Sequence, residues 1–104
     1  MTLRLPGQFS PSTAAGTGAD LLDHEILAEK AAALGRAGER AETSLARLER
    51  HRGGEEERLA LLREAADAVY AWFVQRELCG IRRHDEVIRH YRIPGQVLAR
   101  LGAR

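Results

Sequence analysis

The Gly53-Gly54 pair separates the two longest helical patterns of the sequence, and this arrangement restricts the fold more than any other feature. Before the pair, apolar or small residues recur at alternating intervals of four and three over residues 27–48. After it, the same alternation runs over residues 59–73, in a stretch that opens with three glutamates and contains the only tryptophan. Such spacing is typical of one apolar face on a helix. The sequence therefore predicts an all-α protein.

Capping signals set the expected ends of these two helices. The first helix is predicted to start near Asp20, a good N-cap residue, and to end near Arg52, where basic side chains face the free carbonyl groups. Gly53 is expected to adopt the left-handed conformation that ends many helices. The second helix is predicted over residues 55–79, with its leading glutamates at the positive end of the helix dipole.

Two short helices are expected after a stop at Gly80. The first is predicted from His84 to Tyr91, and the second from Pro94, which fits a first helical position, to Gly102. They are expected to cap the open end of the long helix pair. Alternatively, the second long helix continues through Gly80 to Tyr91, because apolar residues keep helical spacing across the glycine. The residues on which the short helices are expected to pack are Leu21, Leu22 and Ile26.

Two long helices joined by a short glycine connection are expected to fold back as an antiparallel hairpin. If the end of the first helix lies opposite Glu55, facing residues have numbers that sum to about 107. Leu45 then faces Leu62, and Gly38 faces Val69. The two apolar faces, identified separately, thus come into register.

Leucines at the tip of such a hairpin need a second layer to cover them. The C-terminal segment is expected at the opposite end, so a second copy of the chain is expected to provide this layer. The predicted assembly is a homodimer in which two hairpins form a four-helix bundle. A monomer with exposed leucines is the alternative. The residues expected in the dimer interface are Leu45, Leu48, Leu59, Leu61 and Leu62.

The 104 residues are enough for one domain. Residues 1–18, rich in Pro, Gly, Ser and Thr, are expected to form a flexible N-terminal arm, and residues 19–104 a single helical domain. No stretch reaches the ~18 apolar residues of a membrane span, and the first residues lack the continuous apolar core of a signal peptide. The lone Cys79 forms no internal disulfide. A cytoplasmic protein with no membrane association is expected.

The formal net charge is +1, but it is unevenly distributed, with −3 over residues 1–75 and +4 over residues 76–104. Either the basic C-terminal segment or the exposed face of the first long helix is the expected contact with a protein partner. A nucleic-acid-binding regulator is the alternative, because the two short helices superficially resemble a helix-turn-helix with Gln96 and Arg100 on its second helix. The residues predicted to bind a partner are Arg82, Arg83, Arg89, Arg92 and Arg100.

The sequence offers no motif for metal or cofactor chemistry. None of the four histidines follows a glutamate by three residues, as carboxylate-bridged metals in helical bundles require, and neither HExxH nor CxxC occurs. Glu77, His84 and His24 would form a polar pocket if they converged, and solvated surface positions are the alternative. No catalytic, cofactor-binding or metal residue is assigned. The chain is expected to be a non-enzymatic, homodimeric interaction module that needs no cofactor.

Three short stretches in the C-terminal part carry a resemblance to a known family. They are the Glu77–Gly80 run, the segment from Tyr91 to Pro94, and the run from Val97 to Gly102, behind a helix pair rich in Ala, Leu, Arg and Glu. Together they resemble a family of small uncharacterised helical bacterial proteins, a domain of unknown function, over about residues 20–102. The resemblance implies a helical fold and brings no assigned activity or catalytic residues.

Overall fold

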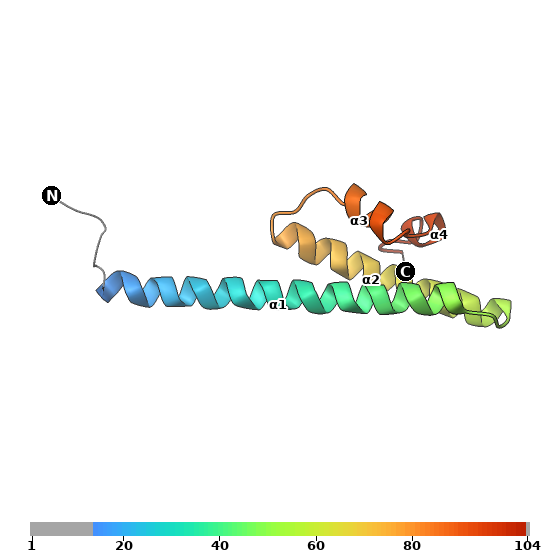
Figure 1. Ribbon diagram of the computed structural model, residues 1–104, viewed down its shortest axis with the longest axis horizontal. Helices are drawn as coiled ribbons and strands as arrows, with labels where there is room; N and C mark the ends of the chain where they lie inside the picture. The colour runs from blue at the N-terminus through green and yellow to red at the C-terminus, as the bar shows by residue number, and fades with distance from the viewer. Residues whose placement is uncertain (1–13, 104) are drawn as a thin grey trace. The chain divides into compact units, whose positions relative to one another are not determined.

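The computed structural model describes residues 14–103, and these form helices without any strand (Figure 1). The helices are α1 (Ala14–Arg50), α2 (Glu55–Leu78), α3 (Asp85–His90) and α4 (Gly95–Leu98). The chain divides into two compact units, one that ends at Ala31 and one that begins at Ala32, and α1 contributes to both. The predicted all-α class is confirmed for the described residues.

The first unit contains the beginning of α1. Because this helix begins at Ala14, the predicted start near Asp20 is wrong, and Asp20 lies inside the helix. Interior glycines such as Gly18 lower helix stability by ~1 kcal/mol each without preventing the helix. The predicted arm otherwise falls on residues 1–13, outside the described residues, and the domain boundary at residue 18 stays a prediction. Every residue from Gly18 to Ala31 is exposed.

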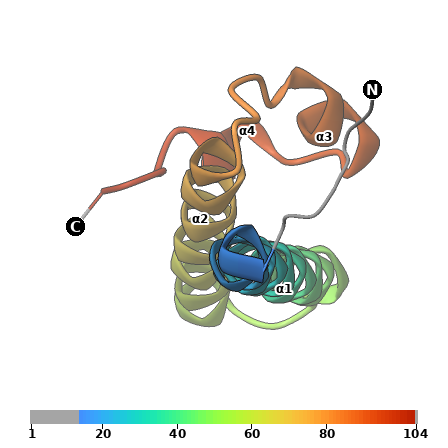
Figure 2. The ribbon, with the colours of Figure 1, turned by 90° about the vertical axis from the view of Figure 1, so that its left-hand side faces the viewer.

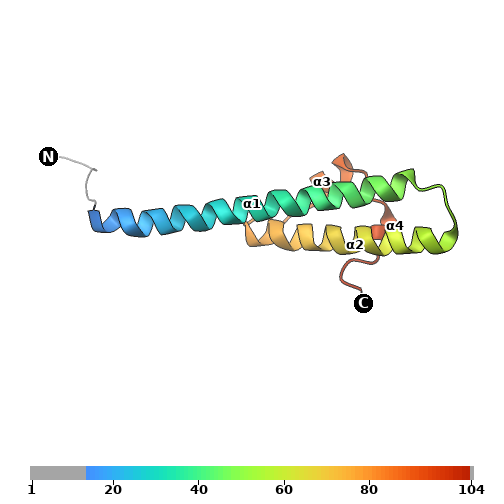
Figure 3. The same cartoon turned by 90° about the horizontal axis from the view of Figure 1, so that it is seen from below.

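In the second unit, residues 32–50 of α1 lie beside α2 and run in the opposite direction (Figure 3). One apolar core joins the two helices, and its burial is the main source of stability. At their edge, Arg47 forms an ion pair with Glu64 at 2.8 Å, an exposed contact that contributes at most about 1 kcal/mol. The buried apolar residues of the two helices are Ala41, Leu45, Leu48, Leu62, Ala65, Ala66, Ala68, Val69, Trp72 and Phe73.

The register of this helix pair differs from the prediction by about one helical turn. A Cβ atom added at Gly38 would lie 3.2 Å from Nε1 of Trp72, whereas the predicted numbering placed Val69 there. The difference arises in the connection between the helices. α1 ends at Arg50, and Gly54 has an extended backbone (φ −80°, ψ 175°), so the chain moves beyond the end of α1 before α2 begins.

Side chains, rather than a left-handed glycine, stabilise this connection. Gly80 and Gly102 are the described glycines with positive φ, so the left-handed conformation predicted for Gly53 is wrong. The His51 ring Nε2 donates to the Gly54 carbonyl at 3.1 Å, and the Gly54 N–H donates to the Glu57 carboxylate at 3.3 Å. The second bond satisfies an N–H group that the start of α2 leaves free, and the Gly54 carbonyl also accepts from the Arg58 N–H at 3.0 Å.

Gly80 reverses the chain after α2. It has φ 89°, its N–H donates to the Glu77 carbonyl at 3.0 Å, and the Ile81 N–H donates to the Arg76 carbonyl at 2.9 Å. This pair of bonds defines a Schellman motif, in which glycine avoids the strain of the left-handed conformation. The predicted stop at Gly80 is confirmed, and the alternative of one helix continuing through it is wrong.

After this reversal the chain lies on one side of the pair formed by α1 and α2 (Figure 2), and α4 packs against α2. Ile93 and Val97 are buried there, and Pro94 is the N-cap of α4 rather than its first residue. The residues on which the short helices were predicted to pack (Leu21, Leu22 and Ile26) belong to the first unit, and this packing stays a prediction. The partly buried residues that join the core from this segment are Val87, Ile88, Tyr91, Leu98 and Leu101.

The leucines predicted to form a dimer interface are covered within the single chain. Three of them are buried and two are partly buried, because the segment after Gly80 runs back along α2. Arg58, one turn into α2, donates to Oε1 of Gln96 at 2.8 Å, which shows how far this segment reaches. The premise that nothing else in the chain reaches these leucines is therefore wrong. The residues concerned are Leu45, Leu48, Leu59, Leu61 and Leu62.

Candidate functional site

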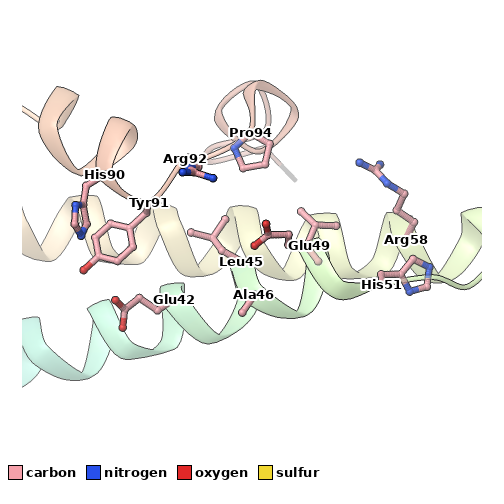
Figure 4. A pocket seen from close by; sticks show the side chains of 11 residues that line it. Glu42, Leu45, Ala46, Glu49, His51, Arg58, His90, Tyr91, Arg92 and Pro94 are labelled. Carbon is pink, nitrogen blue, oxygen red and sulfur yellow. The ribbon is translucent and has the colours of Figure 1, made fainter.

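A cavity of about 660 Å³ lies between α1 and the segment that follows α3 (Figure 4). Its volume falls within the range of small-molecule sites. Leu45, Leu48 and Pro94 provide apolar surface. The polar lining comes from α1 and the residue after it, from the first turn of α2, and from the segment 90–92. These polar residues are Glu42, Glu49, His51, Arg58, His90, Tyr91 and Arg92.

Tyr91 closes one end of this cavity. Its hydroxyl donates to the Glu42 carboxylate, toward which it points in Figure 4, and its ring packs edge-on against Trp72 with centroids 5.3 Å apart. The Glu42 hydrogen bond, reinforced by burial and by the negative charge of that carboxylate, raises the pKa of Tyr91 above its ordinary value of 10.0. Tyr91 thus connects the cavity to the aromatic part of the core.

The raised pKa of Tyr91 predicts a loss of stability at high pH. Because the folded state holds this proton more tightly, the contribution is fully present below about pH 10 and is lost as the pH rises through the folded-state pKa. We expect Tyr91→Phe to remove part of this loss and Tyr70→Phe to retain it. Denaturant unfolding between about pH 8 and 11 measures the effect. Identical pH profiles for Tyr91→Phe and the unchanged chain would contradict it.

Arg92 lies at the edge of the cavity in a left-handed conformation, with φ 52°. It follows α3 in a second Schellman motif, in which its N–H donates to the Arg89 carbonyl (3.2 Å) and the Ile93 N–H donates to the Ile88 carbonyl (3.0 Å). Glycine is preferred at this position, and another residue there costs about 1–2 kcal/mol. Strained positions of this kind concentrate at functional sites.

Two groups of opposite charge face the cavity. Over residues 14–103, neither the Glu49 carboxylate nor the Arg92 guanidinium forms an ion pair or a side-chain hydrogen bond. Arg58 donates one hydrogen bond to Gln96, and its remaining N–H groups are available to a ligand. The cavity therefore offers both a cationic and an anionic contact beside apolar surface.

The five arginines predicted to bind a partner lie at several places. All are exposed, and Arg92 is the one that lines this cavity. Arg83 pairs with Asp85 at 3.0 Å and thereby holds the pKa of that carboxyl below its ordinary value. Arg100 lines a separate hollow beside Asp67. Their role in partner binding stays a prediction. Of the other two arginines, Arg82 follows α2 and Arg89 lies on α3.

The nucleic-acid alternative requires a recognition helix. The candidate, α4, has four residues, and its Gln96 accepts a hydrogen bond from Arg58 within the chain. Recognition helices present several side chains to base edges in the major groove, which so short a helix does not provide. The alternative stays a prediction without support from this geometry.

Glu77 and His84 come together, as the polar-pocket hypothesis required, whereas His24 belongs to the first unit. Nε of Arg76 donates to Nδ1 of His84 at 3.0 Å, so Nε2 carries the ring proton and donates to the Glu77 carboxylate at 3.0 Å. The His84 ring also stacks on Phe73, with centroids 4.1 Å apart. The alternative of a solvated surface position is wrong for His84, whose side chain is 13% exposed. These contacts anchor the start of the C-terminal segment on α2.

Over residues 14–103, no three His, Cys, Asp or Glu side chains lie close enough together to hold a metal ion. In that same range, no helix has both the length and the apolar character needed to cross a bilayer. The expectations of no cofactor and no enzymatic activity stay predictions.

The fold and its sites define a small helical protein in which two long helices carry a C-terminal segment of short helices. The chain belongs to a family of unknown function, DUF6665, whose model matches residues 3–104. This agrees with the resemblance stated above to a family of helical proteins without an assigned activity. Comparison with curated proteins and with solved structures gave no significant match.

Sequence reasoning identified Arg92, Leu45 and Leu48 as functional residues, but it did not bring them into one cavity. It missed the carboxylates of Glu42 and Glu49, although their spacing on α1 indicates that they lie beside Leu45. Glu42 and Glu49 lie three residues before and four residues after Leu45, so all three share one edge of α1. Tyr91 and Arg92 reach this edge only through the reversal at Gly80, and Arg58 reaches it through the connection between α1 and α2, so no local pattern on α1 reveals them.

Proposed function

We propose that the chain is a non-enzymatic protein-interaction module that acts as a homodimer. The observation that carries this proposal is the exposure of eight large apolar side chains among the described residues. Clustered apolar surface of this kind is typical of protein-protein contacts. Four of these residues, Leu21, Leu22, Ile26 and Leu27, belong to the first unit, and the other four, Tyr70, Val74, Leu78 and Ile81, belong to α2 and its end.

Residues 18–31 of the first unit are here called the α1 segment. All of them are exposed, and the four large apolar ones are 50–62% exposed. Isolated helices of this length are marginal in water, and most helical stability in proteins comes from packing an apolar face. A partner that covers these side chains would supply that packing.

The exposed large apolar residues of the second unit form what is here called the α2 stripe, which consists of Tyr70, Val74, Leu78 and Ile81. The first three follow one another at intervals of four and share one face of α2, and Ile81 lies just beyond the end of that helix. Each is at least 37% exposed. A second helix is the partner whose shape suits such a stripe.

Charge complementarity favours contact between these two surfaces on different copies. The α1 segment carries four carboxylates and one lysine, whereas Arg82 and Arg83 lie at the end of the α2 stripe. In the proposed homodimer the α1 segment of each copy packs on the α2 stripe of the other. Two-fold symmetry doubles this contact and brings four long helices together, with an interface that replaces the buried leucines.

Sedimentation velocity with paired variants tests this interface. We expect Leu22→Gln with Ile26→Gln, and separately Val74→Gln with Leu78→Gln, to weaken dimerisation at least about tenfold. These side chains are exposed, so each single chain should keep its fold and its circular dichroism spectrum. Ala60→Gln, an exposed alanine on α2 that lies ten residues before Tyr70, is the matched control and should leave the dimer unchanged.

Mixing the two monomeric variants gives a second, sharper result. A heterodimer of the two retains one unmutated contact between an α1 segment and an α2 stripe, so the mixture should regain a dimer that neither variant forms alone. A dimer that survives both pairs of substitutions would refute the interface. Loss of the dimer without recovery on mixing would mean that each surface contacts its own counterpart instead.

A further inference from the structure

We propose that the cavity between α1 and the segment 90–94 binds a short zwitterionic peptide with apolar side chains. This inference does not rest on the homodimer, because none of the cavity's lining residues belongs to the α1 segment or to the α2 stripe. It rests on the volume of the cavity, on the two unpaired charges at its edge, and on the backbone conformation of Arg92.

The cavity combines apolar surface with charges of both signs. At about 660 Å³ it is large enough for a peptide of two or three residues. Leu45 and Leu48 line it and would contact apolar side chains of the peptide. A purely anionic ligand would meet the Glu49 carboxylate, and a purely cationic one would meet Arg92, so a ligand with one charge of each sign suits the lining best.

Arg92 and Glu49 provide the charged contacts. Arg92 would donate to the carboxylate of the peptide, because a guanidinium forms paired, charge-assisted hydrogen bonds with that group. Glu49, which has no side-chain partner over residues 14–103, would accept from the ammonium group. In Figure 4 Arg92 and Glu49 lie at the same part of the cavity, with Leu45 beside them.

The left-handed backbone conformation of Arg92 makes it possible to distinguish a binding role of this residue from a structural one. The Schellman motif that ends α3 is best served by glycine, so the fold itself gives no reason for an arginine at φ 52°. Arginine at this position places a guanidinium group at the cavity, and this binding role explains why glycine is absent there. Arg92→Gly should therefore raise the melting temperature and, at the same time, weaken peptide binding.

Titration with three related probes tests the ligand class. The probes are the dipeptide Leu-Leu, its C-terminal amide, and its N-acetyl derivative, and binding is followed by the backbone amide NMR shifts of residues 90–93. We expect Leu-Leu to bind and each blocked form to bind about tenfold more weakly, since each lacks one charge-assisted contact. The absence of saturable shifts with Leu-Leu, or equal affinity for the amide, would overturn the proposal.

Variants assign the contacts. Arg92→Gln and Arg92→Gly should each weaken Leu-Leu binding about tenfold, whereas Arg50→Gln, an exposed arginine outside the cavity, should not change it. Glu49→Gln should weaken binding of Leu-Leu but not of the N-acetyl form, which carries no ammonium. Unchanged affinity in both Arg92 variants would overturn the proposal, even if Arg92→Gly raises the melting temperature as expected.

Discussion

Replacing Trp72 with alanine should lower the free energy of unfolding by about 3–5 kcal/mol. Trp72 is 6% exposed and joins three parts of the second unit. Its ring lies against Gly38 on α1, packs edge-on against Tyr91, and contacts Phe73 on its own helix. Truncation removes these contacts and leaves a cavity that the backbones of two long helices are poorly able to fill.

Denaturant unfolding followed by circular dichroism measures this effect. Gln75→Ala is the matched control, because it truncates a polar side chain on the same helix and should change the stability by no more than about 0.5 kcal/mol. If Trp72→Ala were as stable as the control, the tryptophan would have to lie outside the core. Because Trp72 is the only tryptophan, fluorescence is not a suitable probe for this variant.

Replacing Gly38 with leucine should be the second large effect, with a loss of about 1–3 kcal/mol from overpacking. A Cβ atom at this position would already lie 3.2 Å from the Trp72 ring, and a whole side chain requires that ring or the helix to move. Trp72 lies in the middle of the core, so its movement would disturb the contact with Tyr91 as well.

Gly35 provides the matched control on the same helix. A Cβ atom there meets no atom within 4 Å, so Gly35→Leu should instead raise the stability by about 0.5–1 kcal/mol through helix propensity. Thermal unfolding of both variants gives the comparison. Similar effects at the two positions would mean that α1 and α2 do not approach closely at Gly38.

The helices of this protein could be predicted from the sequence because their signals are local. Alternating apolar spacing and the three glutamates at residues 55–57 identify α2, and Gly80 marks its end. The register was wrong because it depends on the path of residues 51–54, where an extended Gly54 displaces the start of α2. No periodicity encodes the length of that displacement.

The position of the C-terminal segment could not be predicted for a related reason. A left-handed Gly80 reverses the chain, and the bonds of His84 to Arg76 and Glu77 then fix its direction. These three residues are eight or fewer positions apart, but their effect is to cover leucines much earlier in the chain. The unpredicted direction after Gly80 therefore led to the wrong premise that nothing else in the chain covers these leucines, and it hid the cavity.

The order of these elements along the chain has a consequence for biosynthesis. α1 and α2 are synthesised before the segment that carries Tyr91, Ile93 and Val97. Core residues of the helix pair, such as Leu45 and Trp72, are therefore more exposed to solvent until that segment folds against them. During this interval the nascent chain displays apolar surface that the finished protein conceals. The segment that lines the cavity at residues 90–94 thus also completes the cover of the core, and so protects it from aggregation.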